Sequence, residues 1–476
     1  MSVASQAPAR PAGERRGLPA AGAWALLGVL LAMVAINLPE LGSDPWPFRP
    51  GSVNPHGPLA PLVRAAGREW DVGIARAATF VAALLCAAAA LPLLRRRAWP
   101  RLAGPVLVLA VGALLLAPST FLQLGLRDST ERWFFTNDST YQVELAGDAL
   151  LHGHDPYGRD YRRSGLERFY TFDGRASRQV REREVALRHV AYFPGTVATG
   201  AAWDLLPRPF DDYRLFVLLC TLATLAAALA FRAPLEWRLA IGALAVCNPI
   251  AVRSAWFGQN DAPSILMLVL AFALLTRRRP TWAAAALAGA VLLKQFALVA
   301  APFLAVMMVQ QGLPRAELRR AALVFGGVLA IAILPFVVVD PGAFYDDTVR
   351  YGAGTYKIVG YGLSGILVRL GVLADRRGAY PFVPIALLTW LPLTAWLLLA
   401  QRRARELWLG AAGFSISILV LLFVGRTFNN YYLLWPLMGA AVGALIASGE
   451  SAGARAGGGG GDGASSAPAR TAPSAP

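Results

Sequence analysis

The sequence predicts an all-α polytopic integral membrane protein with about twelve transmembrane helices, and two features of its composition support this fold class. Hydrophobic residues make up 56% of the 476 residues and charged residues only 16%, whereas soluble domains carry about a quarter charged residues. The net charge of +16 would suggest nucleic-acid binding in a soluble protein. Here the basic residues lie in short clusters between long apolar runs, which is typical of multi-pass membrane proteins. We therefore expect a cell-membrane protein in contact with membrane lipids, and no nucleic-acid partner.

The N-terminal part of the chain is predicted to precede the main module. Residues 1–21 are rich in proline and alanine and predict a disordered cytoplasmic segment. The apolar run 22–39 is long enough to cross a membrane. No small-residue cleavage site with a polar start follows it, which favours a retained signal anchor over a cleaved signal peptide. With a second apolar run at 73–94, it predicts an additional helix pair within residues 22–101.

The main module is predicted to span residues 102–447, because apolar runs long enough for membrane helices follow one another through this region. The candidate spans are 102–122, 211–231, 237–256, 261–276, 282–293, 296–309, 321–339, 380–400, 406–424 and 431–447. The tail 448–476 contains a run of glycines with serine, alanine and proline, and predicts a disordered cytoplasmic segment.

Arginines in the short loops predict the orientation of the module. They form clusters at 95–101, 277–279, 315–320 and 402–405. Basic residues in short loops stay in the cytoplasm, so both chain termini are predicted to be cytoplasmic. The segments left outside are 123–210, 257–260, 340–379 and 425–430.

The long segment 123–210 is itself basic, but long loops are translocated largely regardless of their charge. Within it, the apolar stretch 193–206 is too short to span the bilayer and begins at Phe193-Pro194. It predicts an interfacial helix on the outer surface.

The runs 282–293 and 296–309 are short, and Lys294 separates them. One continuous helix would place the arginines at 402–405 outside, against the charge rule. We therefore predict a hairpin with Lys294 near its outer apex.

Asp138 is the first candidate catalytic residue, because it follows a predicted exit from the membrane on the outer side. A carboxylate there can act as a general base on a lipid-linked substrate at the bilayer surface. The structural alternative is that Asp138 caps a helix running from about Ser139 to Leu151. The residue types alone leave both roles open.

Charged residues within or beside the later spans form a second group of candidates. Arg253 and Lys294 lie in apolar runs, where an ionisable group is a functional hypothesis by default, although either could instead snorkel to the head groups. Asp261 precedes Ala262-Pro263 and could serve as a helix cap or as a catalytic group. Arg426 opens a polar turn on the predicted outer face.

The sequence predicts no metal site and no cofactor. His152 and His154 flank Gly153, but two histidines without further ligands are a weak metal signal. The three cysteines, Cys86, Cys220 and Cys247, lie in apolar runs without metal-like spacing. Because no glycine-rich phosphate loop is present, no site for a soluble sugar-nucleotide donor is expected.

Taken together, these stretches resemble the GT-C superfamily of membrane glycosyltransferases, and most closely glycosyltransferase family 87, which includes polyprenyl-phosphate-mannose-dependent mannosyltransferases of bacteria. The resemblance extends over residues 102–447. The residues that carry it are Asp138-Ser-Thr-Tyr141, Gly153-His-Asp-Pro156-Tyr157, Tyr192-Phe193-Pro194, Asn248-Pro249, Gly258-Gln259-Asn260-Asp261, Leu293-Lys294, Gly362-Leu-Ser364-Gly365 and Tyr431-Tyr432-Leu-Leu-Trp-Pro436.

The resemblance implies an inverting hexosyltransferase of the cell envelope. It would move a sugar, expected to be mannose, from a polyprenyl-phosphate donor to a hydroxyl of a glycolipid or glycan acceptor at the extracytoplasmic face. In that picture Asp138 is the base. Lys294, Arg253 and Arg426 bind the donor phosphate, and the substrate-binding residues are Tyr141, Tyr157, Gln259, Asp261 and Tyr431.

A transporter of lipid-linked saccharides and an inactive GT-C-like scaffold are the alternatives. A transporter would more often carry mid-span charges and an internal repeat, whereas here the polar residues collect at outer helix ends. A single outward cavity lined by Asp138, Asp261, Lys294 and Arg426 would favour the enzyme.

Overall fold

The computed structural model describes most of the predicted main module. The described residues are 54–65, 78–79, 81–82, 85, 103–170, 185–355, 358–376 and 379–458. The predicted N-terminal segment 1–21, the span 22–39, most of the span 73–94 and the end of the tail from 459 lie outside them.

The described chain is almost entirely helical. Up to residue 276 the α-helices are α2 (Ala60–Ala65), α4 (Ala103–Asp128), α5 (Asp138–Leu151), α7 (Pro194–Asp204), α8 (Tyr213–Ala228), α9 (Leu235–Val246), α10 (Pro249–Phe257) and α11 (Asp261–Thr276). After it they are α12 (Pro280–Leu293), α13 (Ala301–Gln310), α14 (Arg315–Val339), α15 (Pro341–Tyr345), α16 (Leu363–Arg369), α17 (Phe382–Leu388), α18 (Trp390–Ala404), α19 (Trp408–Val424) and α20 (Leu434–Gly458).

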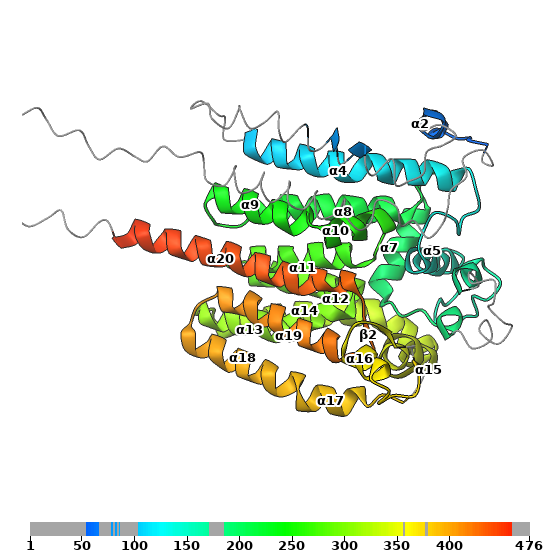
Figure 1. Ribbon diagram of the computed structural model, residues 1–476. Coiled ribbons are helices and arrows are strands. Elements are labelled where there is room, and N and C mark those ends of the chain that lie inside the picture. The colour runs from blue at the N-terminus through cyan, green and yellow to red at the C-terminus, as the bar shows by residue number, and fades with distance from the viewer. Residues whose placement is uncertain are drawn as a thin grey trace, which may run out of the picture.

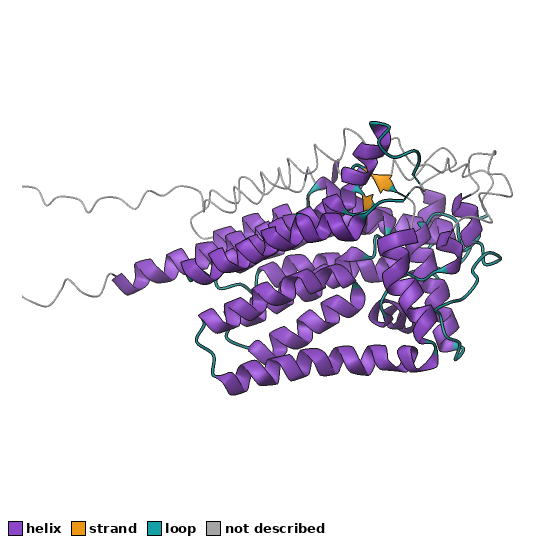
Figure 2. Cartoon of the chain, turned by 90° about the horizontal axis from the view of Figure 1, so that it is seen from below, coloured by secondary structure: helices purple, strands orange, loops and turns teal. Residues whose placement is uncertain are grey.

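Shorter elements connect these helices. The 3₁₀ helices are η2 (Leu166–Tyr170), η3 (Val185–Arg188), η4 (Gln295–Ala300) and η6 (Asn430–Leu433), and η5 (Asp346–Thr355) is a π-helix. The sheet found in the described residues is a parallel pair, β1 (Val359–Gly360) with β2 (Thr427–Phe428). Figure 2 shows both strands towards the end of the bundle where most loops gather.

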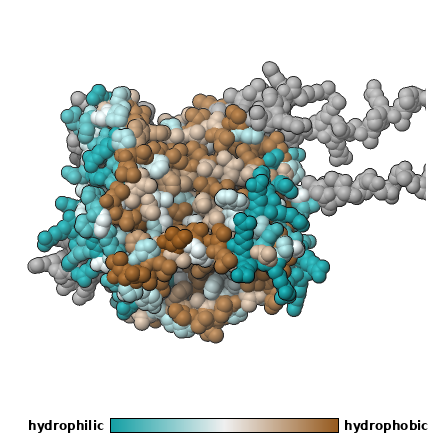
Figure 3. All heavy atoms as spheres, turned by 180° about the vertical axis from the view of Figure 1, so that it is seen from behind, coloured by the Kyte–Doolittle hydropathy of each residue, from teal (hydrophilic) through white to brown (hydrophobic). Residues whose placement is uncertain are grey.

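The long helices lie side by side, while α5, α7, α15 and α16 gather at one end of the bundle (Figure 1). In the part of the chain that the structure describes, four helical segments are long and apolar enough to cross a membrane: Gly104–Asp128, Arg315–Val339, Phe382–Ala404 and Asn430–Glu450. Apolar side chains such as Ile331 and Val338, each 79% exposed, would be costly to present to water. Figure 3 shows a broad apolar zone between two hydrophilic ends, as expected for a protein embedded in lipid.

Several predicted spans are interrupted. The predicted span 237–256 divides into α9 and α10, because Asn248 caps a new helix by accepting hydrogen bonds from the backbone N–H groups of Ile250 and Ala251, both at 3.0 Å. The span 380–400 divides at Thr389 into α17 and α18. The shorter apolar helices have 10–17 residues, so the prediction of about twelve full spans stays a prediction.

The chain reverses at Lys294, as the sequence predicted. The η4–α13 segment returns alongside α11. At its end the Gln311 side chain donates to the Leu275 carbonyl at 2.9 Å, and the Gln311 backbone carbonyl accepts from the Arg278 side chain at 3.4 Å. Lys294 itself has an extended backbone between α12 and η4. The hairpin therefore has its apex at the end of the bundle that holds α5 and α7 (Figure 1).

Three of the four predicted arginine clusters, 277–279, 315–320 and 402–405, lie at the opposite end of the bundle (Figure 1), and the fourth, 95–101, lies outside the described residues. Arg277 donates to the Ala230 carbonyl at 2.6 Å, and Gln310 donates to the Gln401 carbonyl at 2.7 Å. The loops after α8, α11, α13 and α18 therefore share one end of the molecule (Figure 1).

Two predictions about the helices beside the bundle can be compared with the structure. The apolar stretch 193–206 forms α7, which packs closely on α5. Gly147 and Gly200 allow the two backbones to approach, since a Cβ on Gly147 would lie 2.5 Å from the Ala201 nitrogen. At the C-terminus α20 runs to Gly458, beyond the predicted start of the tail at 448. Alanines in this stretch favour continuation of the helix.

Candidate active site

A cavity of about 350 Å³ opens where the ends of five segments meet: the start of α5, the start of α11, the apex at Lys294, the π-helix η5 and the turn after α19. Its lining consists of Asp138, Ser139, Gln142, Ala191, Tyr192, Gln259, Asn260, Asp261, Lys294, Gln295, Phe296, Thr348, Val349, Tyr351, Phe382, Leu421, Leu422, Gly425, Arg426, Thr427, Asn429, Tyr431 and Tyr432. Most of the predicted site residues therefore lie around one cavity.

Asp138 is the first residue of α5, but it does not cap that helix. The N-cap is Asn137, whose side-chain oxygen accepts from the Thr140 backbone N–H at 2.8 Å. The prediction that Asp138 serves as the cap is thus wrong by one residue. Asp138 lies in the first turn and accepts from the Ser139 N–H at 2.9 Å, where the partial positive charge of the helix start stabilises a carboxylate.

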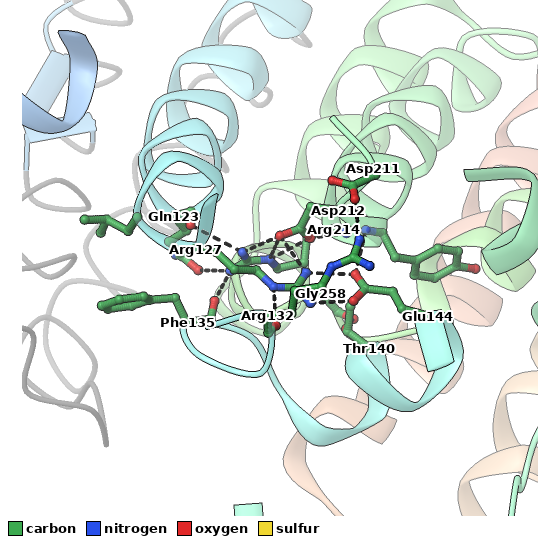
Figure 4. A network of polar contacts seen from close by, with 12 residues as sticks. Gln123, Arg127, Arg132, Phe135, Thr140, Glu144, Asp211, Asp212, Arg214 and Gly258 are labelled. Carbon is green, nitrogen blue, oxygen red and sulfur yellow. Dashed lines mark hydrogen bonds and ion pairs between the residues drawn. The ribbon is translucent and has the colours of Figure 1, made fainter. Parts of the chain in front are cut away.

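Asp138 is held in place by a buried network of charged residues that joins α4, α5 and α8 (Figure 4). Arg127 donates to Glu144 at 2.8 Å and pairs with Asp212 at 2.9 Å. Arg214 is completely buried and pairs with Asp212 at 2.6 Å. Breaking such a network would leave an unpaired charge in an apolar interior, which costs several kcal/mol, on the order of 3–5.

The same network reaches the backbone on both sides of Asp138. Arg214 donates to the carbonyl of Phe135 in the loop before α5, and the Thr140 hydroxyl donates to the carbonyl of Gly258. Gly258 has a φ of +73°, and a Cβ there would lie 2.3 Å from the Arg214 side chain. The turn that carries Gln259 and Asp261 is therefore fastened to the start of α5.

Asp261 and Lys294 form an ion pair inside the cavity. Asp261 is 1% exposed; its Oδ1 accepts from the Trp435 indole at 2.8 Å and lies 3.6 Å from Lys294 Nζ. The N-cap of α11 is Asn260, without a side-chain capping bond, so the predicted capping role of Asp261 is not the observed one. The Lys294 ammonium lies 5.1 Å from the Tyr192 ring and 5.7 Å from the Phe296 ring, so it points into the cavity and does not snorkel.

Arg426 also lines the cavity, from the turn after α19. Its carbonyl accepts from the Val359 N–H at 3.2 Å and from the Ser364 hydroxyl at 3.2 Å. The neighbouring Gly360 has a φ of +87°, and a Cβ there would lie 1.9 Å from the Phe428 carbonyl oxygen. Burial lowers the pKa of Arg426 from its usual value, and Tyr380 nearby opposes that shift, but a guanidinium remains protonated.

The outer wall of the cavity is the π-helix η5, an arrangement often found at functional sites. Its Tyr351 stacks on His189 with ring centroids 4.9 Å apart, and His189 also bonds to the buried Asp347. Gln295 ties this wall to the hairpin apex by donating to the carbonyls of Ala191 at 2.9 Å and Thr348 at 3.3 Å.

Six of the predicted site residues line the cavity and three do not. Those that line it are Asp138, Gln259, Asp261, Lys294, Arg426 and Tyr431. Tyr141 donates to the Ser164 carbonyl at 2.6 Å and Tyr157 to the Tyr192 carbonyl at 2.9 Å, so both brace the surrounding loops. The Arg253 guanidinium lies 5.6 Å from the Phe257 ring, outside the cavity.

Sequence reasoning missed two sets of residues. The charged network was absent from it, although Arg127 and Arg214 next to apolar runs gave the same signal that identified Lys294. The uncharged lining residues Gln142, Tyr192 and Gln295 gave no comparable signal. In the described ranges no group of three or more His, Cys, Asp or Glu residues could hold a metal ion, and His152 pairs with Asp148 instead.

Comparison with known proteins identifies one family. Residues 191–425 match the model of glycosyltransferase family 87. This match covers the segments that carry Gln259, Asp261 and Lys294, ends beside Arg426, and does not extend to Asp138. No curated protein and no solved structure matches the chain.

Proposed function

We propose that the protein, whose residues 191–425 match the model of glycosyltransferase family 87, transfers mannose from a polyprenyl-phosphate donor to an acceptor hydroxyl at the extracytoplasmic membrane face. The family match indicates a glycosyltransferase, and the long apolar helices indicate a membrane protein. The donor, the sugar and the side of the membrane are the parts that we propose.

The observation that carries the proposal is the presence of a carboxylate and two cations around one cavity. Asp138, Lys294 and Arg426 come from three distant parts of the chain, yet all line it. A transfer from a phosphate-linked sugar needs a base for the acceptor hydroxyl and positive charge for the departing phosphate. The cavity offers both.

In the proposed reaction Asp138 accepts the proton of the acceptor hydroxyl. The hydroxyl oxygen forms a bond to the anomeric carbon while the bond from that carbon to the phosphate oxygen breaks, and polyprenyl phosphate leaves with the electron pair. Attack opposite the leaving group inverts the anomeric configuration. Arg426 and Lys294 offset the charge that develops on the phosphate, and this effect is stronger in an apolar environment than in water.

Asp138 fits the role of base better than Asp261 does. Asp261 Oδ1 already accepts from Trp435 and lies beside the Lys294 ammonium, and the residue is almost completely buried, so its carboxylate is less accessible to an acceptor hydroxyl. Asp138 is only half-buried and lines the cavity at the first turn of α5, where an incoming hydroxyl can reach its carboxylate.

The proposed membrane side follows from the arginine clusters. The three clusters within the described residues lie at the end of the bundle opposite the cavity (Figure 1), and arginines in short loops favour the cytoplasm. The cavity would then face the outer leaflet, where a lipid-linked donor presents its head group.

The test is the substitution Asp138→Asn, assayed in membranes with radiolabelled polyprenyl-phosphate mannose. Removing a general base is expected to lower the transfer rate by about 10²–10⁴-fold. The matched control is Asp148→Asn on the same helix, whose carboxylate is 54% exposed and outside the cavity; it should transfer at the normal rate. Normal turnover by Asp138→Asn would remove Asp138 as the base.

A further inference from the structure

Two buried hydrogen-bond acceptors in the cavity lining have no partner among the described residues. They are Oδ1 of Asn260, a residue 3% exposed, and Oδ2 of Asp261, a residue 1% exposed. Both residues belong to the lining. Buried polar atoms are nearly always hydrogen-bonded in proteins, so each exception calls for an explanation.

The rest of each side chain is occupied, which fixes the atoms that remain. The Asn260 amide nitrogen Nδ2 donates to the Ser139 carbonyl at 3.2 Å. This bond fixes the orientation of the amide and identifies the remaining atom as the oxygen Oδ1. Asp261 uses Oδ1 to accept from Trp435 at 2.8 Å, which leaves Oδ2. Two adjacent residues of the cavity lining thus each carry one unpartnered acceptor.

These acceptors select among possible ligands. A phosphate offers no proton and would repel the Asp261 carboxylate. A divalent cation is disfavoured because Lys294 Nζ already lies 3.6 Å from the other carboxylate oxygen. Neutral hydroxyl groups are donors that can satisfy both oxygens, and adjacent hydroxyls are what a hexose ring presents.

The position of the two acceptors indicates which sugar they would bind. Asn260 is bonded to Ser139, the neighbour of the proposed base Asp138, and Asp261 is paired with the proposed phosphate contact Lys294. The transferred sugar must lie between the attacking hydroxyl and the phosphate. The acceptor pair lies between the groups that serve these two partners.

We propose that Asn260 and Asp261 bind two adjacent hydroxyls of the sugar that is transferred, so that they form the hexose subsite of the donor. The inference rests on the proposed function and adds a specific recognition role. Lys294 then also neutralises Asp261, so that a carboxylate can share the cavity with a phosphate-bearing donor.

The test measures binding to the full chain in nanodiscs, so it does not depend on turnover. Polyprenyl-phosphate mannose and polyprenyl phosphate are compared as ligands of the wild type, Asp261→Asn and Asn260→Ala. Asp261→Asn can keep the acceptor for Trp435 while replacing the other oxygen with a donor. Ser264→Ala serves as control, because Ser264 lies on the same helix but bonds to the Ala290 carbonyl outside the cavity.

The wild type and Ser264→Ala should bind the mannosylated lipid about tenfold more tightly than polyprenyl phosphate, the effect of one good hydrogen bond to a charged group. Both site variants should lose this preference. Asn260→Ala should bind polyprenyl phosphate as the wild type does, and Asp261→Asn should bind it at least as tightly, because the carboxylate beside Lys294 is then replaced by a neutral amide. A donor with a deoxy sugar at the contacted position should bind the wild type about tenfold more weakly and Asp261→Asn no more weakly.

Three results would overturn the inference. The sugar preference could survive in both variants, affinity for both lipids could fall equally, or the preference could vanish on chelation of divalent cations. A wild-type chain that binds neither lipid would overturn the proposed function as well. If Asp261→Asn and Asn260→Ala both keep the preference for the mannosylated lipid while Asp138→Asn loses transfer activity, only the hexose subsite is overturned.

Discussion

Asn137 and Asp138 are neighbours with separate roles. Asn137 caps α5 and also donates to the carbonyl of Phe257, which links the start of α5 to the end of α10. A helix cap is worth about 1 kcal/mol, and Asn137 carries this structural role. Capping and catalysis were alternatives for Asp138 in the sequence; the structure assigns the cap to its neighbour, and the role of Asp138 as base stays a proposal.

The site could be predicted from the sequence where a charge stood out against an apolar background. Lys294 was found in this way, whereas Asp138 and Arg426 were found by their places beside predicted membrane exits on the outer face. The sequence could not tell which side of α5 faces the cavity, because α5 is covered on several sides and the hydropathy pattern of Tyr141 resembles that of a lining residue. Uncharged lining residues such as Gln295 depend on the hairpin geometry, which composition does not contain.

Asp155, in the loop after α5, provides a test of electrostatics at the residue scale. Burial and the nearby carboxylates of Asp340 and Asp347 raise the pKa of Asp155, and a bond from the Tyr157 N–H partly opposes this. A raised carboxyl pKa means that ionisation disfavours the fold, so stability is lost as the pH rises through the folded-state pKa. Asp155→Asn should therefore raise the melting temperature at pH 7 by up to about 2 °C.

The same substitution should have little effect at a pH well below the ordinary Asp pKa of about 3.9, where Asp155 is protonated in both the folded and the unfolded wild type. Asp160→Asn is the control of opposite sign, because hydrogen bonds from Arg162 lower the pKa of Asp160. It should be neutral or slightly destabilising at pH 7. Equal shifts of Asp155→Asn at both pH values would contradict the electrostatic explanation.

At the scale of elements, interruptions of helices determine where the site forms. The breaks at Asn248 and Lys294 lie within runs that hydropathy treats as continuous, because a window average registers composition and not backbone geometry. Pro249 gave a local signal for the first break. Lys294 was found through the charge rule and the orientation of a distant loop, so the hairpin was predictable while the exact ends of its helices were not.

The strand pair beside Arg426 gives a test at this scale. Gly360→Ala is expected to reduce transfer at least tenfold, because a Cβ at 1.9 Å from the Phe428 carbonyl must displace the turn that holds Arg426. Gly371→Ala is the matched control: Gly371 has a similar φ of +73°, but a Cβ there would meet no atom within 4 Å, so it tests strain without displacement. Radiolabel transfer and melting temperature would both be measured; equal losses in the two variants would argue against a specific role of the turn.

At the scale of the whole molecule, hydrophilic residues gather at both ends of the bundle and an apolar zone lies between them (Figure 3). The predicted fold class of a helical membrane protein agrees with this arrangement and with the four long apolar segments in the described residues. The first two predicted spans lie largely outside the described residues, so the added N-terminal helix pair stays a prediction.

The orientation can be tested by cysteine labelling. His152→Cys lies at the cavity end and Arg403→Cys at the arginine end, and both positions are exposed. A membrane-impermeant maleimide applied to intact cells should label His152→Cys, and should label Arg403→Cys only after permeabilisation. The unsubstituted chain is the control, and its Cys220 and Cys247 are buried. The reverse labelling pattern would place the cavity in the cytoplasm.

The buried charged network of α4, α5 and α8 has a consequence for how a substrate can enter. Moving α5 away from its neighbours would strand guanidinium groups in an apolar interior, so the helix that carries Asp138 cannot work as a lid. On the other side of the cavity η5 is also fastened by a charged group, because the buried Asp347 carboxylate bonds to His189 and accepts from the Gly158 and Val190 N–H groups. The turn of Arg426 accepts from the Val359 N–H and the Ser364 hydroxyl. The α5 side of the cavity is therefore a fixed wall, and we expect a movement that widens the cavity to cost least at the turn of Arg426.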